Sequence, residues 1–194
     1  EYPTAIEYFN QSLQTAQQIG DRFREERNLG NLGNVYKFLG KYDKAIEHYK
    51  EAIEIATQIG DKRNQGIFLG NIGDLLLKLK RWGEAEQHLS EAIEICIEIA
   101  FPIGIGVFKG SLSLVYSQQS KMDESLQLLE EGEPLVEVYP LEHGKFLCKK
   151  AKVLLIAKQL NKAIEALEQA KEIATQIKAK PDSELPTAIT ESMM

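Results

Sequence analysis

The segment Glu51-Ala52-Ile53-Glu54-Ile55 recurs 40 residues later as Glu91-Ala92-Ile93-Glu94-Ile95. The same interval relates Asn31-Leu32-Gly33 to Asn71-Ile72-Gly73. A fixed period of this length is the sequence signature of a repeat architecture, in which each unit buries its apolar face against the next. The sequence therefore predicts an array of stacked structural units.

Each unit contains two stretches whose apolar residues recur at helical spacing. The first helices of the units are expected at residues 22–39, 62–80, 102–119 and 141–159. The second helices are expected at residues 42–59, 82–99, 122–138 and 161–178. Gly40 and its neighbours would form the tight turn inside a hairpin of two helices.

Weaker copies of the repeat continue beyond residue 100. The column formed by Ala5, Ala45 and Ala85 continues as Ser125 and Ala163, and its last interval is 38 residues instead of 40. The unit that is two residues short also carries Gly132 and Pro134 in its second helix. Proline removes a backbone donor and clashes with the preceding turn, so this helix is expected to be shortened or bent.

Residues at the unit boundaries have the chemistry of helix ends. Asp21 and Asp61 are expected to act as N-caps, because a short side-chain oxygen can accept hydrogen bonds from free backbone donors. Gly20 and Gly60, which precede them, suit the left-handed residue that ends a helix. Within a hairpin, Gly33 and its counterpart Gly73 would let the two helices approach closely.

The repeats divide the chain into six parts. These are the second helix of a truncated first repeat at 1–21, complete repeats at 22–60 and 61–100, degenerate repeats at 101–139 and 140–178, and a capping helix or tail at 179–194. Because residues 1–21 have no preceding partner helix, Ile6 and Phe9 would be exposed, and the chain is expected to be a piece of a longer protein. At the other end Asp182 can cap a helix with Leu185 and Ile189 on its apolar face; the alternative is a disordered tail.

The stretches Leu32–Tyr36, Gly40–Tyr42 and Ala45–Tyr49, followed by Ala52, resemble the tetratricopeptide repeat, with its pattern of small and aromatic residues. The resemblance implies an all-α fold, a right-handed superhelix (α-solenoid) of antiparallel helical hairpins, whose first helices line a concave groove. The 40-residue spacing is similar to the long-repeat subclass. That subclass includes kinesin light chains, mitotic-orientation scaffolds and the sensor arrays of bacterial signalling proteins.

In each first helix, the residues that face the groove are expected at positions i, i+4, i+7 and i+11, which lie on one side of a helix. This stripe comprises Arg27, Asn31, Asn34 and Phe38 in the second unit, Ile67, Asn71, Asp74 and Lys78 in the third, Val107, Ser111, Leu114 and Gln118 in the fourth, and Lys145, Lys149, Lys152 and Ile156 in the fifth.

Two features of the stripe indicate binding. Asn31, Asn34 and Asn71 lie inside helices, where asparagine is unfavourable, and an amide can hold the main chain of an extended peptide. The alternative is a solvated position, or an amide that bonds a neighbouring helix. Lys145 and Lys149, with Lys152, form a positive stripe that could meet an acidic side chain or a free C-terminal carboxylate of a partner, unless they are ordinary solvated charges.

Several other classes of function are not favoured. The net charge of −6 and a pI of about 5.3 argue against nucleic acid as a partner. No run of 18 apolar residues predicts a membrane span, and Cys96 and Cys148 form no metal-ligand pattern. His48 and His88 are one repeat apart and are interpreted as repeat positions, not catalytic groups. No cofactor, no enzymatic activity and a cytoplasmic location are expected.

The leading hypothesis is a non-catalytic protein–protein interaction scaffold, whose groove takes a partner segment or peptide, or another domain of the same full-length chain. One alternative is a regulatory module of a bacterial signalling protein that senses a small signalling peptide. Another is a structural element that self-associates through its ends.

Overall fold

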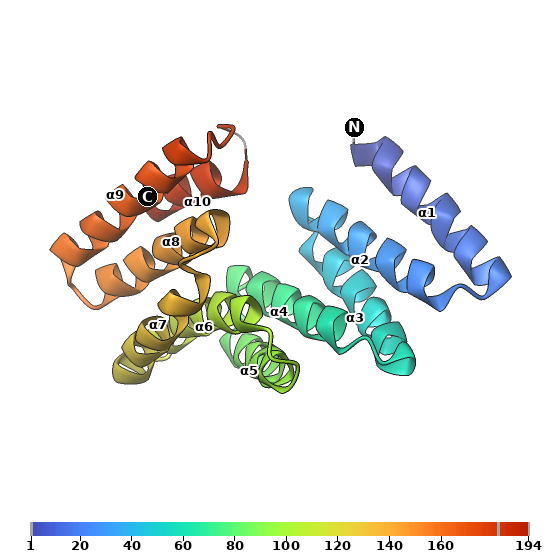
Figure 1. The fold of residues 1–194 in the computed structure, drawn as a ribbon, viewed down its shortest axis with the longest axis horizontal. Coiled ribbons are helices and arrows are strands. Elements are labelled where there is room, and N and C mark those ends of the chain that lie inside the picture. Colours follow the sequence, from blue (N-terminus) through green and yellow to red (C-terminus); the bar gives the residue numbers. More distant parts are fainter. Residues whose placement is uncertain (1, 182, 194) are drawn as a thin grey trace. The chain divides into compact units, whose positions relative to one another are not determined.

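The computed structural model describes residues 2–181 and 183–193, which form ten α-helices and no strand (Figure 1). The helices are α1 Tyr2–Ile19, α2 Arg22–Phe38, α3 Tyr42–Ile59, α4 Lys62–Lys78, α5 Trp82–Glu98, α6 Pro102–Gln118, α7 Met122–Val136, α8 Pro140–Ile156, α9 Leu160–Gln176 and α10 Glu184–Met193. They belong to two compact units, unit 1 (Glu1–Ile99) and unit 2 (Ala100–Met194). The predicted all-α class is confirmed.

Consecutive helices pair as antiparallel hairpins, α2 with α3 and α4 with α5 in unit 1, and α6 with α7 and α8 with α9 in unit 2 (Figure 1). The glycines at 33 and 73 explain how closely the helices of unit 1 approach. A Cβ atom on Gly33 would lie 2.5 Å from the Tyr49 ring, and one on Gly73 would lie 2.5 Å from Leu89 Cγ. The close approach predicted for these glycines is therefore confirmed.

The helix boundaries follow the predicted turn chemistry. Gly20 and Gly60 have φ angles of +71° and +75°, in the left-handed region, as predicted. Asp21 Oδ1 accepts from the Arg24 backbone N–H at 3.0 Å, and Asp61 Oδ1 accepts from that of Asn64 at 2.9 Å. Both predicted N-caps are thus confirmed.

The first helices end one to three residues before the predicted boundaries. The reason is visible at Lys80 and Lys158, which have positive φ angles of 59° and 58° and so cannot continue a right-handed helix. Lysine itself has no preference for a positive φ, but both residues occupy the repeat column of Gly40, whose φ is +69°.

The second helix of the fourth unit, α7, is shortened as predicted, to 15 residues, and it contains Pro134 in its last turn. In unit 2, α8 pairs with α9 and, across the boundary between repeats, packs more against the preceding first helix α6 than against α7. Gly110 permits this contact, since a Cβ there would lie 2.7 Å from the Phe146 ring of α8. Unit 1 has the same approach, since a Cβ on Gly30 would lie 2.6 Å from the Phe68 ring of α4, so the shorter α7 is the feature that distinguishes unit 2.

Residues 184–193 form α10, which packs against α8 and α9 (Figure 1). Leu185 and Ile189, the apolar residues singled out in the sequence, are buried there together with Leu147 and Ala170. The cap predicted at Asp182 lies outside the described residues. By covering the last hairpin, α10 removes apolar surface of α8 and α9 from water.

Candidate functional site

In unit 1 the predicted groove stripe runs along one side of α2 and α4. On α2, Arg27 is exposed, Asn31 and Asn34 are half-buried, and Phe38 is 55% exposed. On α4, Ile67, Asn71 and Asp74 are half-buried and Lys78 is exposed. The eight positions therefore remain partly or fully open to solvent, with polar side chains predominating.

The three asparagines of the stripe have different environments. Asn34 Oδ1 accepts a hydrogen bond from the Tyr49 hydroxyl of α3 at 2.7 Å, so this amide connects the two helices of a hairpin. Leu89 occupies the equivalent of Tyr49 in the next hairpin and has no hydroxyl to donate. Within residues 2–181 and 183–193, neither the Asn31 nor the Asn71 side chain has a hydrogen-bond partner. Their donors and acceptors face solvent.

Phe38, at the end of the α2 stripe, belongs to an aromatic cluster. The Tyr2 ring of α1 stacks on it with centroids 6.4 Å apart and an interplanar angle of 18°. The Lys37 ammonium lies 5.5 Å from the centroid of the Phe38 ring. A half-exposed aromatic pair beside a cation offers an apolar contact to a ligand at this end of the stripe.

In unit 2 the stripe on α6 is largely closed. Ser111 is 0% exposed and Leu114 is 8% exposed, while Val107 is half-buried and Gln118 is exposed. Leu114 was predicted to supply an apolar contact to a partner, and the structure contradicts this because its side chain is packed in the interior. Sequence spacing determines the face of the helix but not how neighbouring helices pack on it, and here Leu114 is buried.

The lysines of α8 make contacts within unit 2. Lys145 Nζ lies 2.7 Å from the Glu142 carboxylate and 3.0 Å from that of Glu184 in α10. Lys149 Nζ donates to Ser111 Oγ at 2.5 Å and to the Val107 carbonyl at 3.4 Å. Burial alone would lower the pKa of Lys145, but the two carboxylates outweigh it and the pKa is raised. These two lysines therefore brace α8 against its neighbours.

Lys152 completes the predicted positive stripe and is half-buried. In the part of the chain that the structure describes, Lys152 has no ion-pair partner. Lys150, beside the stripe, pairs with Glu133 at 2.6 Å. The free positive charge available to a ligand in unit 2 is consequently smaller than the lysine content of α8 suggests.

The histidine and cysteine side chains occupy structural environments. His48 stacks on Tyr36 at a centroid distance of 5.2 Å, and burial lowers its pKa. Burial raises the pKa of Cys96 and of Cys148 to about 11, so both remain protonated thiols at neutral pH. No group of three or more histidine, cysteine, aspartate or glutamate residues within the described ranges is arranged to hold a metal ion.

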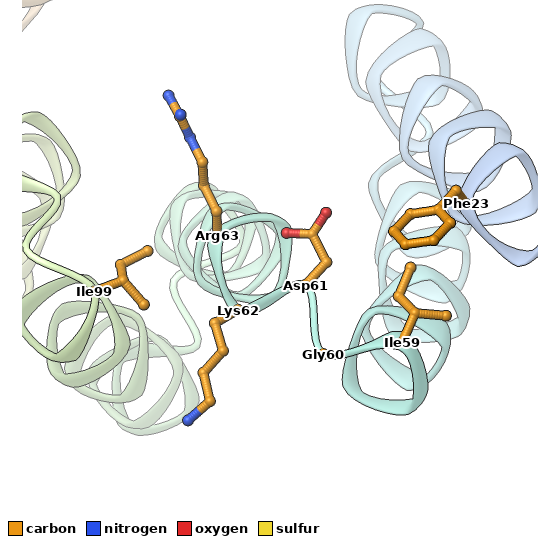
Figure 2. Close-up of a pocket in the computed structure, with 7 residues that line it drawn as sticks. All are labelled: Phe23, Ile59, Gly60, Asp61, Lys62, Arg63 and Ile99. Atoms are coloured by element: carbon orange, nitrogen blue, oxygen red, sulfur yellow. The ribbon is translucent and has the colours of Figure 1, made fainter.

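A surface depression of about 640 Å³ in unit 1 was not anticipated from the sequence (Figure 2). It lies where α4 begins, and Figure 2 shows Phe23 beside Ile59 on one side of Asp61, with Lys62 and Arg63 directed to opposite sides of the helix. Lys62 Nζ pairs with Glu98 of α5 at 2.6 Å. Phe23 is 61% exposed and gives this depression an apolar wall.

These features define a class of protein, the all-α proteins built from stacked helical hairpins. The family model for the tetratricopeptide repeat matches residues 1–58 and 25–98, and a second tetratricopeptide repeat model matches residues 144–177. The chain belongs to the tetratricopeptide repeat family. Proteins of this family are generally non-catalytic scaffolds for protein–protein interaction, as the resemblance implied. No helix in the described residues is both long enough and apolar enough to span a membrane.

Relatives and solved structures extend this result. The human protein G-protein-signaling modulator 1 is 46% identical over 44 residues, which are 23% of this chain and 6% of that protein. BtubC (BKLC) from P. vanneervenii superposes with a TM-score of 0.73 at 18% identity, over 94% of this chain and 77% of that one. A putative kinesin light chain of Podospora anserina superposes with a TM-score of 0.67 at 14% identity, over 92% and 89%. The structural likenesses support the fold alone.

Proposed function

We propose that the α2–α4 stripe of unit 1 binds an extended segment of a protein partner. The observation that carries the proposal is the pair Asn31 and Asn71, which lie one repeat apart on successive first helices. Both are half-buried and have no hydrogen-bond partner within the described residues. An amide offers two donors and one acceptor, so it can hold a peptide main chain without reading the side chains.

The side chains around the two amides suggest the composition of the segment. Arg27 and Lys78 are exposed and positively charged, and they favour an acidic segment or one that ends in a free carboxylate. The Tyr2–Phe38 pair would take an apolar side chain near one end of the segment. We infer that the partner is an acidic peptide with an apolar residue, supplied by another protein or by another domain of the full-length chain.

The same proposal assigns no reaction to the described residues. Cys96 and Cys148 are buried thiols with raised pKa values, and His48 is held by an aromatic stack, so none of these side chains reaches a bound segment as a nucleophile or base. The function we propose is therefore non-catalytic binding.

The proposal is tested by selecting binders from a library of 12-residue peptides enriched in Asp and Glu, and measuring their affinity by fluorescence polarisation. Asn31→Ala and Asn71→Ala should each weaken binding about tenfold, because each removes one or two hydrogen bonds to the peptide. The matched control is Asn10→Ala. Asn10 is an exposed asparagine of α1, outside the α2–α4 stripe, and this variant should bind normally. Unchanged affinity in Asn31→Ala and Asn71→Ala would remove the two amides from the site.

A further inference from the structure

A buried glutamate stands in unit 1 where the other complete repeats have glycine. Glu26 aligns with Gly66 in the next repeat and with Gly106 and Gly144 in unit 2. The glycines permit close packing: a Cβ on Gly66 would lie 3.2 Å from Ile95 Cγ2, and one on Gly106 would lie 2.7 Å from the Gly132 carbonyl oxygen. Glu26 places a full side chain at this crowded position, and it is only 1% exposed.

The Glu26 carboxyl group is incompletely hydrogen-bonded. Its Oε1 atom is buried and has no hydrogen-bond partner among the described residues. The Asn64 side chain of α4 hydrogen-bonds the Glu26 carboxyl, but Asn64 Nδ2 also donates to Asp61 Oδ2 at 3.1 Å. Two carboxyl groups therefore depend on one amide, at the point where α4 begins.

The groups around Glu26 make its ionised form unfavourable. Burial raises the pKa of Glu26 to about 7, and the nearby negative charge of Asp61 also raises it; the Asn64 hydrogen bond and Arg27, on the same helix, act in the opposite direction. From α3, the residues equivalent to Ile95 and Cys96 are Ile55 and Ala56, which are buried and apolar. From α1, Gln17 donates to the neighbouring Glu25 at 3.3 Å.

We propose that protonation of the Glu26 carboxyl controls how tightly the start of α4 packs against α2 and α3, and that loss of the proton loosens this junction. A neutral carboxyl adds no charge beside Asp61, whereas an ionised one has a buried oxygen without a donor and faces a second negative charge. Opening the junction would bring water to Glu26 and relieve both costs.

The direction of the pH effect follows from the position of the proton. Between pH 4.5, the ordinary value for glutamate, and pH 7, the folded chain keeps a proton on Glu26 that the unfolded chain has lost. The free energy of unfolding therefore falls as the pH rises through this interval, and it stays low above it. The three glycine-bearing repeats have no such dependence at this position.

The test is hydrogen–deuterium exchange of the full chain between pH 5.5 and pH 8, with rates corrected for intrinsic exchange. Amides of the α2–α4 junction in the wild type should lose about tenfold of their protection over this range. Glu26→Gln, which keeps the shape without the charge, should change by less than about twofold. Glu47→Gln, at an exposed glutamate of α3, is the matched control and should behave like the wild type.

If Glu26→Gln packs poorly, a second variant and a direct titration still test the proposal. Glu26→Gly restores the residue of the other repeats and should also abolish the pH dependence. The Glu26 side-chain carboxyl carbon, followed by ¹³C NMR, should titrate near pH 7. An ordinary titration of that carbon near pH 4.5, or an equal pH dependence in Glu26→Gln and wild type, would overturn the proposal.

Discussion

The same repeat position is open in one half of the molecule and closed in the other. In unit 1 it is occupied by Asn31 and Asn71, which have no hydrogen-bond partner among the described residues; in unit 2 it is occupied by Ser111 and Lys149, which bond each other at 2.5 Å. A repeat position thus has no constant role. Its side chain is available to a ligand only where the neighbouring repeat does not use it.

The packing of the helices explains part of this difference. Across the boundary between repeats, α4 of unit 1 packs mainly against the second helix α3, whereas α8 of unit 2 packs more against the first helix α6 than against the second helix α7. The α7 helix is shorter, with 15 residues. The close approach of a phenylalanine to a glycine is common to both units, since Gly30 faces Phe68 as Gly110 faces Phe146. In unit 2 Lys149 of α8 reaches Ser111 Oγ and the Val107 carbonyl of α6.

The largest effect is expected where unit 1 depends on glycine and unit 2 does not. Gly33→Ala would place a Cβ 2.5 Å from the Tyr49 ring, whereas the equivalent positions in unit 2, Ser113 and Ala151, already carry one. We expect a loss of about 2 kcal/mol in the free energy of unfolding, measured by urea denaturation. Gly83→Ala, an open helical site, is the control and should stabilise the protein by about 0.5–1 kcal/mol.

A smaller effect on stability should distinguish Lys149, which is hydrogen-bonded to α6, from Asn31, which has no hydrogen-bond partner among the described residues. Lys149→Met removes donors from Ser111 Oγ and the Val107 carbonyl and should lower the free energy of unfolding by about 1–1.5 kcal/mol. Asn31→Ala should change it by less than about 0.5 kcal/mol, because no internal bond is lost. Equal losses in both variants, measured by urea denaturation, would contradict the distinction between the two units.

The smallest effect concerns the left-handed turn residues, which are mostly glycine in unit 1 and never glycine in the described part of unit 2. Ser120 and Lys158 have φ angles of 64° and 58°. Ser120→Gly and Lys158→Gly should each raise stability by about 0.5–1 kcal/mol, because glycine adopts this conformation without steric cost. Gly40→Ala makes the opposite substitution at a residue with positive φ and should lower the melting temperature in thermal denaturation. A higher melting temperature would contradict the left-handed conformation of this residue.

Much of the fold could be predicted because individual cap and turn residues recur at the repeat interval. Asp21 and Asp61 cap helices through their own nearby backbone, and Gly33 and Gly73 are required by the helix directly opposite. These are local or nearest-neighbour constraints, which a 40-residue period makes visible. The left-handed Lys80 and Lys158 were missed because lysine has no preference for that conformation, although both occupy the repeat column of Gly40.

The candidate site was predictable only as a face of the first helices. Spacing along one helix determines which side chains share that face, and Arg27, Asn31 and Asn71 are open there. It does not determine how other helices pack on that face, and for that reason the burial of Leu114 and the ion pair of Lys145 with Glu184 were not foreseen.

The sequence by itself determined the helical hairpins, their order and the face on which a ligand would be sought, because helical periodicity, caps and turn glycines act within about one repeat. Only the tertiary structure decided which polar groups on that face are free. Asn34 is held by Tyr49, Lys149 is held by Ser111, and Glu26 is buried with one oxygen unpaired. Each of these outcomes depends on distances between separate helices, and a hydrogen bond is gained or lost over less than one ångström.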